Sequence, residues 1–509
     1  MKIRIMKQLI YFLGIILLTS CSLLKPKYKV SKNKFSQQYA STITQQELKT
    51  HLEVIASDEY EGRETGKKGQ RMTAEYLRKE LDSYGVTPGN NGGNFQYFPL
   101  LETNKPQANF LFHNKDFRYA KEFYFYATMA KFEAFDTEVS NLVSVEYGIV
   151  EGERDDYKSL EVEGKIVVIK LESPSEFKQW DWRKKVRFAE SRGAKQVFFS
   201  SANYQENLEK VHHYLTKSSM RLATDIVNKK NQFIPFYFLS DELLNEIYLI
   251  EKPDSTFLIL HPQYETIQFN YTKGMERIES SNVVGLIEGS DPELKHEYII
   301  LTAHYDHLGI QNGEVYNGAD DDGTGTVALL EIAQAFQKAK NEGNGPKRSI
   351  VIMPVSGEEK GLLGSRYYTE NPIFPLEKTV ANLNIDMIGR LDEHHTEKEY
   401  VYVIGADKIS KELHLINEAT NKKYTKLELD YTFNNENDPN RFYYRSDHYN
   451  FAKNGIPVIF YFSGVHEDYH KASDEVDKIL FDKVETITQL VFYTAWELAN
   501  KPTRLKLND

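Results

Sequence analysis

The 509-residue sequence predicts an α/β fold, with a mostly parallel, mixed sheet flanked by helices and an inserted β-rich domain. Three observations lead to this prediction. From residue 280 onward, short apolar runs alternate with amphipathic helices, which is the rhythm of parallel sheets. Between residues 106 and 278, short β-type runs alternate with charged loops instead. Hydrophobic residues make up 40% of the chain, so it can bury a core, and its length suits more than one domain.

The first residues have the features of an export signal. A positively charged start is followed by the apolar run at residues 10–18, which is too short to cross a bilayer comfortably. Residues 18–21 resemble the bacterial lipobox, in which the cysteine is lipidated; the alternative for Cys21 is a buried free thiol. We therefore expect a lipoprotein signal peptide at 1–20 and a tether at 21–39. The protein would be exported to the cell envelope, on the periplasmic or surface face of a membrane that it contacts only through Cys21.

The composition excludes several classes of protein. Lys and Arg total 63 and Asp and Glu total 74, giving a net charge of −11, so no nucleic-acid partner is expected. Cys21 is the single cysteine of the sequence. An internal disulfide framework and cysteine-based zinc sites are therefore excluded.

Helical spacing of leucines predicts helices over residues 45–81, interrupted by a turn-rich break at 61–66. The middle region shows several β-type runs and one short helix. The runs are at 141–145, 165–170, 196–200 and 233–239, and the helix is at 183–192. The last region supplies the parallel sheet and its helices. Its strands are expected at 298–303, 349–355, 381–385 and 456–462, and its helices at 323–338, 362–370 and 481–498.

Acidic and histidine side chains follow these last strands one after another. The first strand leads into His304, Asp306 and His307, the next into Glu358 and Glu359, and the third into Asp386. An Asp320–Asp322 run precedes a helix, and His466 and His470 follow the final strand. Taken singly, these residues have ordinary explanations, such as helix capping or solvated loop charge. At the carboxyl ends of parallel strands they would converge, and divalent cations would offset their repulsion. A His/Asp/Glu set without sulfur suits zinc, or less specifically manganese or cobalt.

Within these motifs, some choices stay open. His307 competes with His304, which is preferred because it directly ends the strand. His466 competes with His470 as the late ligand. The segment at 446–448 could suggest a Ser/His/Asp triad, but the sequence lacks a Gly-x-Ser-x-Gly elbow, so we expect this segment to be a pocket wall.

Residues 280–502 resemble the co-catalytic dizinc aminopeptidase family, which includes bacterial leucyl aminopeptidase, with glutamate carboxypeptidase II, the transferrin receptor and glutaminyl cyclase as relatives. The matching pieces are His304-x-Asp306, Gly318-Ala319-Asp320-Asp321, Glu358-Glu359, Asn384-Ile385-Asp386-Met387 and Tyr469-His470. The resemblance implies a zinc peptidase domain at 40–105 and 279–505. The segment at 106–278 resembles a protease-associated (PA) domain, through Asp155-Asp156-Tyr157, Gly164-Lys165-Ile166-Val167-Val168 and Gly193-Ala194.

The resemblance also implies roles for single residues. Asp321 would bridge two zinc ions, with His304 and Asp386 completing one site and Glu359 and His470 the other. Asp306 would accept a hydrogen bond from His304 and fix its tautomer. Glu358 would be the general base that takes a proton from the attacking water. The family's bridging aspartate is followed by a strained peptide bond, and Asp322 stands in that place.

The expected function is an exported, lipid-anchored metallopeptidase that hydrolyses peptides, most simply an aminopeptidase that releases N-terminal residues. Acidic groups near the metals would suit a free α-amine, whereas Arg445 would suit a carboxylate and hence a carboxypeptidase. Glutaminyl cyclase chemistry is a second alternative, although the full set of five ligands argues against a one-metal site. A non-catalytic binding relative is the third, although this chain retains every ligand of the pattern.

Overall fold

The computed structural model describes residues 28–31, 34–216, 218–225, 232–247 and 265–508. The expected signal peptide and Cys21 lie outside these ranges. The chain divides into two units, one made of residues 1–98 with 279–509 and the other of residues 99–278. It passes from the first unit to the second within strand β2 (Phe95–Thr103) and returns within β15 (Met275–Val283). None of the described helices has both the length and the apolar composition that a bilayer crossing requires.

The first unit is built on an eight-stranded mixed sheet, so the predicted fold class is confirmed. Its central strands β20, β17, β21 and β24 run parallel, while β16 and β22 flank them in the antiparallel direction. The strands, in spatial order, are β1 (Thr87–Pro88), β16 (Gly285–Ile287), β20 (Ser349–Val355), β17 (Tyr298–His304), β21 (Thr379–Ile385), β24 (Val458–Phe462), β22 (Tyr400–Ile404) and β23 (Glu428–Asp430).

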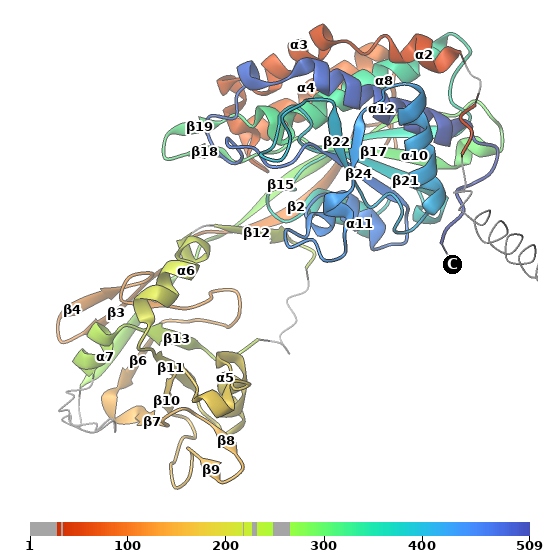
Figure 1. Ribbon diagram of the computed structural model, residues 1–509. Coiled ribbons are helices and arrows are strands. Elements are labelled where there is room, and N and C mark those ends of the chain that lie inside the picture. Colours follow the sequence, from red (N-terminus) through yellow and green to blue (C-terminus); the bar gives the residue numbers. More distant parts are fainter. Residues whose placement is uncertain (1–27, 32–33, 217, 226–231, 248–264, 509) are drawn as a thin grey trace, which may run out of the picture. The chain divides into compact units, whose positions relative to one another are not determined.

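Helices cover both faces of this sheet (Figure 1). On one face α8 (Gly325–Asn341) and α12 (Phe481–Asn500) pack with α3 (Gln45–Ile55) and α4 (Lys68–Tyr84), and these elements bury one continuous core. α9 (Leu363–Glu370) and α11 (His448–Ala452) lie against a second core that includes Ile300 and Val351. Neighbouring residues of the central strands thus face opposite cores, and these strands are buried on both sides.

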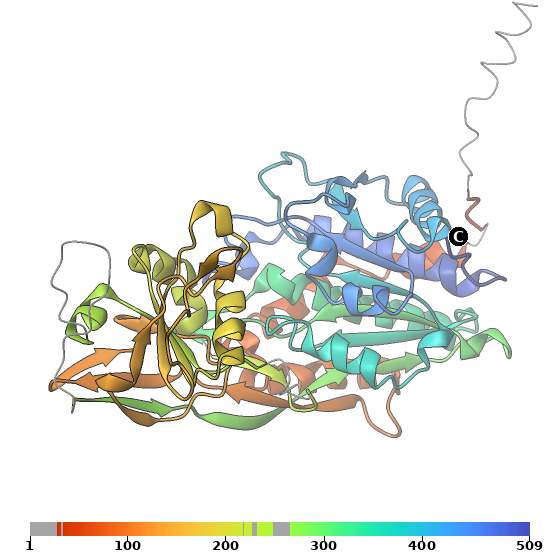
Figure 2. The ribbon, with the colours of Figure 1, turned by 90° about the horizontal axis from the view of Figure 1, so that it is seen from below.

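The second unit is drawn in orange, yellow and yellow-green in the ribbon (Figures 1 and 2). It has its own aromatic core, in which Phe110 and Tyr237 contact each other and both contact Phe198 and Phe269. One sheet contains β5 (Phe123–Tyr124), β13 (Phe236–Leu239), β11 (Gln196–Ser200), β10 (Ile166–Lys170) and β7 (Leu142–Ser144); the other contains β4 (Lys115–Arg118), β3 (Gln107–Phe112), β14 (Thr266–Thr272) and β6 (Phe135–Glu138). The helices are α5 (Trp182–Ser191), α6 (Tyr204–Thr216) and α7 (Asp241–Ile247). The likeness of this unit to a PA domain stays a prediction.

A buried arginine holds the loops at the carboxyl edge of the first unit's sheet. Arg63 ends the short helix η1 (Asp58–Arg63) and has no exposed surface. Its guanidinium donates to the carbonyl oxygens of Tyr305, Ile55, Asn317 and Gly318. It therefore links the end of β17 to the loop that precedes α8.

We expect Arg63→Met to lower the free energy of unfolding of the metal-free protein by about 3–5 kcal/mol, because several buried carbonyls lose their donor. Urea unfolding followed by circular dichroism measures the change. Arg78→Met is the control, because Arg78 is a partly exposed residue of α4 that pairs with Glu75 and Asp82, and it should cost less than about 1 kcal/mol. Equal losses in the two variants would contradict the anchoring role of Arg63.

Candidate metal centre

The sheet topology brings the acidic and histidine side chains together. His304 is the last residue of β17, Asp386 directly follows β21, and Glu358 and Glu359 follow β20. These three strands run parallel, so their carboxyl ends meet at one edge of the sheet. Asp321 lies in the loop η6 (Ala319–Thr324) that enters α8, and the Asp321–Asp322 peptide bond is cis.

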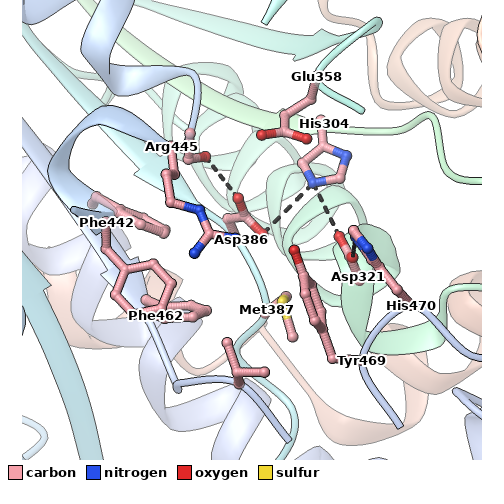
Figure 3. A pocket seen from close by; sticks show the side chains of 13 residues that line it. His304, Asp321, Glu358, Asp386, Met387, Phe442, Arg445, Phe462, Tyr469 and His470 are labelled. Atoms are coloured by element: carbon pink, nitrogen blue, oxygen red, sulfur yellow. Dashed lines mark hydrogen bonds and ion pairs between the residues drawn. The ribbon is translucent and has the colours of Figure 1, made fainter. Parts of the chain in front are cut away.

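Two groups of ligand atoms share Asp321 (Figure 3). His304 Nε2 lies 3.2 Å from Asp321 Oδ1 and 3.6 Å from Asp386 Oδ1. His470 Nε2 lies 3.2 Å from Asp321 Oδ2 and 3.4 Å from Glu359 Oε2. The two oxygens of one carboxylate therefore face different groups, which is the arrangement needed to bridge two cations.

His307 is a neighbour of the second group. It is fully buried, its Nδ1 lies 2.9 Å from Glu359 Oε1 and 3.8 Å from Asp321 Oδ2, and His307, Asp321 and Glu359 could themselves hold a cation. We favour His470 as the ligand because its nitrogen is within 3.4 Å of both carboxylates, whereas His307 is engaged with the far oxygen of Glu359. Sequence reasoning weighed His307 only against His304 and missed this contact.

The expected hydrogen bond between His304 and the Asp306 side chain is wrong. His304 Nδ1 lies 3.0 Å from the backbone carbonyl oxygen of Asp306, whereas the carboxylate Oδ1 is 3.9 Å away. The carboxylate is held elsewhere, since it accepts from Thr65 Oγ1 at 2.6 Å and from the backbone N–H of Glu358 at 3.3 Å. Asp306 therefore orients His304 through its main chain and Glu358 through its side chain.

Ser446 orients Asp386, a role that sequence reasoning did not assign. Its hydroxyl donates to Asp386 Oδ2 at 2.6 Å and accepts from Asn384 Nδ2 at 2.9 Å. The two residues that follow do not form a triad with it. Asp447 pairs with Ser365, and His448 stacks on Phe460, where burial lowers the pKa of its imidazole to about 3.

His466, the alternative late ligand, lies outside both groups. Its Nε2 is 3.4 Å from Asp320 Oδ2, and its Nδ1 accepts from the backbone N–H of Asp468 at 3.2 Å. The backbone N–H groups of Asp320 and Asp321 donate to Asp474. These contacts fix the loops that carry Asp321 and His470 and leave His466 with a structural role.

The electrostatics of the centre favour bound cations. Burial alone would lower the pKa of the His304 imidazole, but Asp386 and Glu358 outweigh it and raise this pKa well above its usual value. Burial alone would raise the pKa of Asp321, but its histidine neighbours hold it well below its usual range. Among the described residues no donor reaches the buried Asp321 Oδ2 with hydrogen-bonding geometry. This orphaned lone pair and the nitrogen and oxygen donor set fit a zinc-type ion.

Comparisons with known proteins agree with this chemistry. Residues 282–495 match the sequence profile described as Peptidase family M28, so the chain carries an M28 domain. It is 38% identical over 106 residues to "Probable glutamate carboxypeptidase LAMP1" of Arabidopsis thaliana, covering 21% of this chain and 14% of that protein. It is 26% identical over 235 residues to "Aminopeptidase YwaD" of Bacillus subtilis, covering 45% and 46%. The chain thus spans less than half the length of either relative.

The fold also resembles a solved structure. An aminopeptidase from Aneurinibacillus sp. strain AM-1 superposes with a TM-score of 0.54 at 17% identity, covering 93% of this chain and 98% of that one. At this level of identity the likeness concerns the fold alone.

The bridging geometry predicts the metal content of variants. Asp321→Ala should lose both cations, whereas His470→Ala should lose one, because only Asp321 faces both groups. Metal analysis of the dialysed proteins checks this. His394→Ala is the control, because His394 is an exposed histidine that belongs to neither group, and this variant should keep both ions. Full double occupancy in Asp321→Ala would refute the bridge.

Proposed function

We propose that the chain is a two-metal exopeptidase, most simply an aminopeptidase, that hydrolyses peptides at a pair of zinc ions. The observation that carries the proposal is the Asp321 carboxylate, whose two oxygens face separate His/carboxylate groups, with Glu358 beside them in one pocket. When bound, two cations of this kind polarise the scissile carbonyl and lower the pKa of a water molecule. The M28 domain supports the same assignment.

Glu358 is suited to be the proton carrier. It is half-buried at the pocket wall, and desolvation, together with Glu359 and Asp386, raises the pKa of its carboxyl well above the usual value. A raised pKa makes the carboxylate a better proton acceptor and the carboxylic acid a usable donor to the leaving amine. The backbone N–H of Glu358 donates to Asp306 Oδ1, which holds the Glu358 side chain toward the pocket. The neighbouring Glu359 side chain points to the second group of ligand atoms.

Tyr469 is suited to bind the substrate carbonyl. Its side chain lines the pocket next to His470, and Figure 3 shows its hydroxyl pointing toward the carboxylates. Burial and the nearby carboxylates of Asp321 and Glu359 raise the pKa of the phenol far above its usual value. The phenol therefore stays protonated and can donate a hydrogen bond to a developing oxyanion.

The carboxylates that line the pocket, Glu358 among them, can accept hydrogen bonds from an α-amine, which favours an amino terminus as the recognised end of the substrate. Carboxypeptidase action is the second candidate, because Arg445 lines the same pocket and the Arabidopsis thaliana relative is named a probable glutamate carboxypeptidase. Peptides blocked at either end distinguish the two. Cleavage of C-terminally amidated but not N-acetylated peptides supports the aminopeptidase, and the opposite pattern supports the carboxypeptidase.

We expect Glu358→Gln to keep both metals and to lower kcat by a factor of about 10² to 10⁴, because it removes proton transfer without removing a ligand. Steady-state kinetics with parallel metal analysis measures both quantities. Glu467→Gln, an exposed glutamate near His470, should leave kcat unchanged. Unimpaired turnover in a fully metallated Glu358→Gln protein would reject the assignment.

We also propose that the protein is an exported lipoprotein anchored through Cys21. The support is the sequence at residues 1–21, which lies outside the described part of the chain. Expressed with its signal in a bacterial host, the protein should incorporate labelled palmitate and partition into detergent, while Cys21→Ala should do neither. Equal labelling of both forms would contradict the anchor.

A further inference from the structure

The pocket beside the metal centre has two chemically different walls. His304, Asp321, Glu358 and Asp386 line the side where a peptide bond would be cleaved. The other side is mainly apolar and includes Met387, Phe442, Phe462 and Val465. The pocket opens to solvent, so the terminal residue of a peptide can enter it from outside.

Arg445 adds a positive charge to the apolar wall. Its guanidinium carbon lies 4.9 Å from the ring centroid of Phe442, and Figure 3 shows the group between Phe442 and Asp386. Arg445 is exposed, and no carboxylate in the described part of the chain forms an ion pair with it. The aromatic contact restrains the side chain but leaves its N–H donors free for a ligand.

The charge of this pocket changes sign once metals are counted. The carboxylates of Asp321, Glu358, Glu359 and Asp386 carry up to four negative charges, and two divalent cations would cancel them. Arg445 is then the uncompensated charge beside the apolar wall. A guanidinium restrained against an aromatic ring can form a bidentate contact with a carboxylate.

We propose that this pocket selects peptides whose terminal residue has an acidic side chain, glutamate above all. The methylene groups of the side chain would pack against Phe442 and Phe462, and the carboxylate would pair with Arg445. The inference rests on the proposed exopeptidase function and defines its substrate class. An alternative is that Arg445 binds the α-carboxylate of a substrate, which the test below distinguishes.

The experiment compares the zinc-loaded protein and its variants on Glu-, Gln- and Leu-p-nitroanilide. Glutamine has nearly the shape of glutamate without its charge, so the Glu/Gln ratio of kcat/KM isolates the electrostatic contribution. We expect a ratio of at least about ten in the unaltered protein, because a charge-assisted hydrogen bond contributes about 1.5–3 kcal/mol. Arg445→Met should bring this ratio to one or below while Leu-p-nitroanilide turnover stays within about twofold, and Arg445→Lys should retain part of the preference.

Arg441→Met is the matched control. Its guanidinium also lies 4.9 Å from an aromatic ring, that of Tyr444, in the same segment but outside the pocket lining. It should keep the Glu/Gln ratio of the unaltered protein.

Preference for Leu or Gln in the unaltered protein, or an equal loss on all three substrates in Arg445→Met, would overturn the inference while leaving the exopeptidase intact. Cleavage confined to N-blocked peptides would assign Arg445 to the α-carboxylate instead. Absence of turnover together with absence of bound metal would reject the proposed function itself.

Discussion

The repulsion among carboxylates gathered at one edge of the sheet is the constraint on which the rest of this structure depends. Asp321, Glu358, Glu359 and Asp386 meet there, with Asp306 and Asp322 buried behind them. Each buried ion would cost several kcal/mol if it stayed uncompensated. Arg63 supplies one fixed positive charge at the back of the cluster, and His304 and His470 supply nitrogen ligands at the front. The pair of divalent cations proposed above would offset the remaining negative charge, and the sheet topology brings their proposed ligands together.

The convergence of these residues could be predicted because each lies at the end of a strand or in a loop that follows a strand or precedes a helix. His304 and Asp386 are fixed within one residue of a strand end, so the rule that parallel strands end at one edge suffices to bring them together. His307 and the Asp306 carboxylate lie beyond β17, where the turn decides what each side chain meets. The contacts of His307 with Glu359 and of Asp306 with Thr65 join segments far apart in sequence. No local pattern encodes them.

In the second unit, too, the sequence predicts some strands and misses others. Buried runs such as β10 and β11 were predictable, because each contains at least three consecutive apolar residues and is buried along all or nearly all of its length. β15 was not, because its first five residues are mostly exposed and its last four are buried, so it shows no regular alternation. β15 leaves one unit and enters the other, and each half responds to different surroundings. Periodicity detects a strand only where one environment extends along its whole length.

Neighbouring donors determine how many oxygens each ligand can offer a metal. Ser446 occupies Asp386 Oδ2 and His307 occupies Glu359 Oε1, so each carboxylate has one oxygen, Oδ1 or Oε2, left for a cation. At Asp321 the two oxygens face histidine nitrogens of different groups, Oδ1 that of His304 and Oδ2 that of His470. The Asp322 carboxylate connects three segments of the site. It accepts hydrogen bonds from the backbone N–H groups of His304 at the end of β17, Gly325 at the start of α8 and Met387, which follows Asp386. These hydrogen bonds hold the three carboxylates in place without an ion, which is the preorganisation that the proposed two-metal site would require.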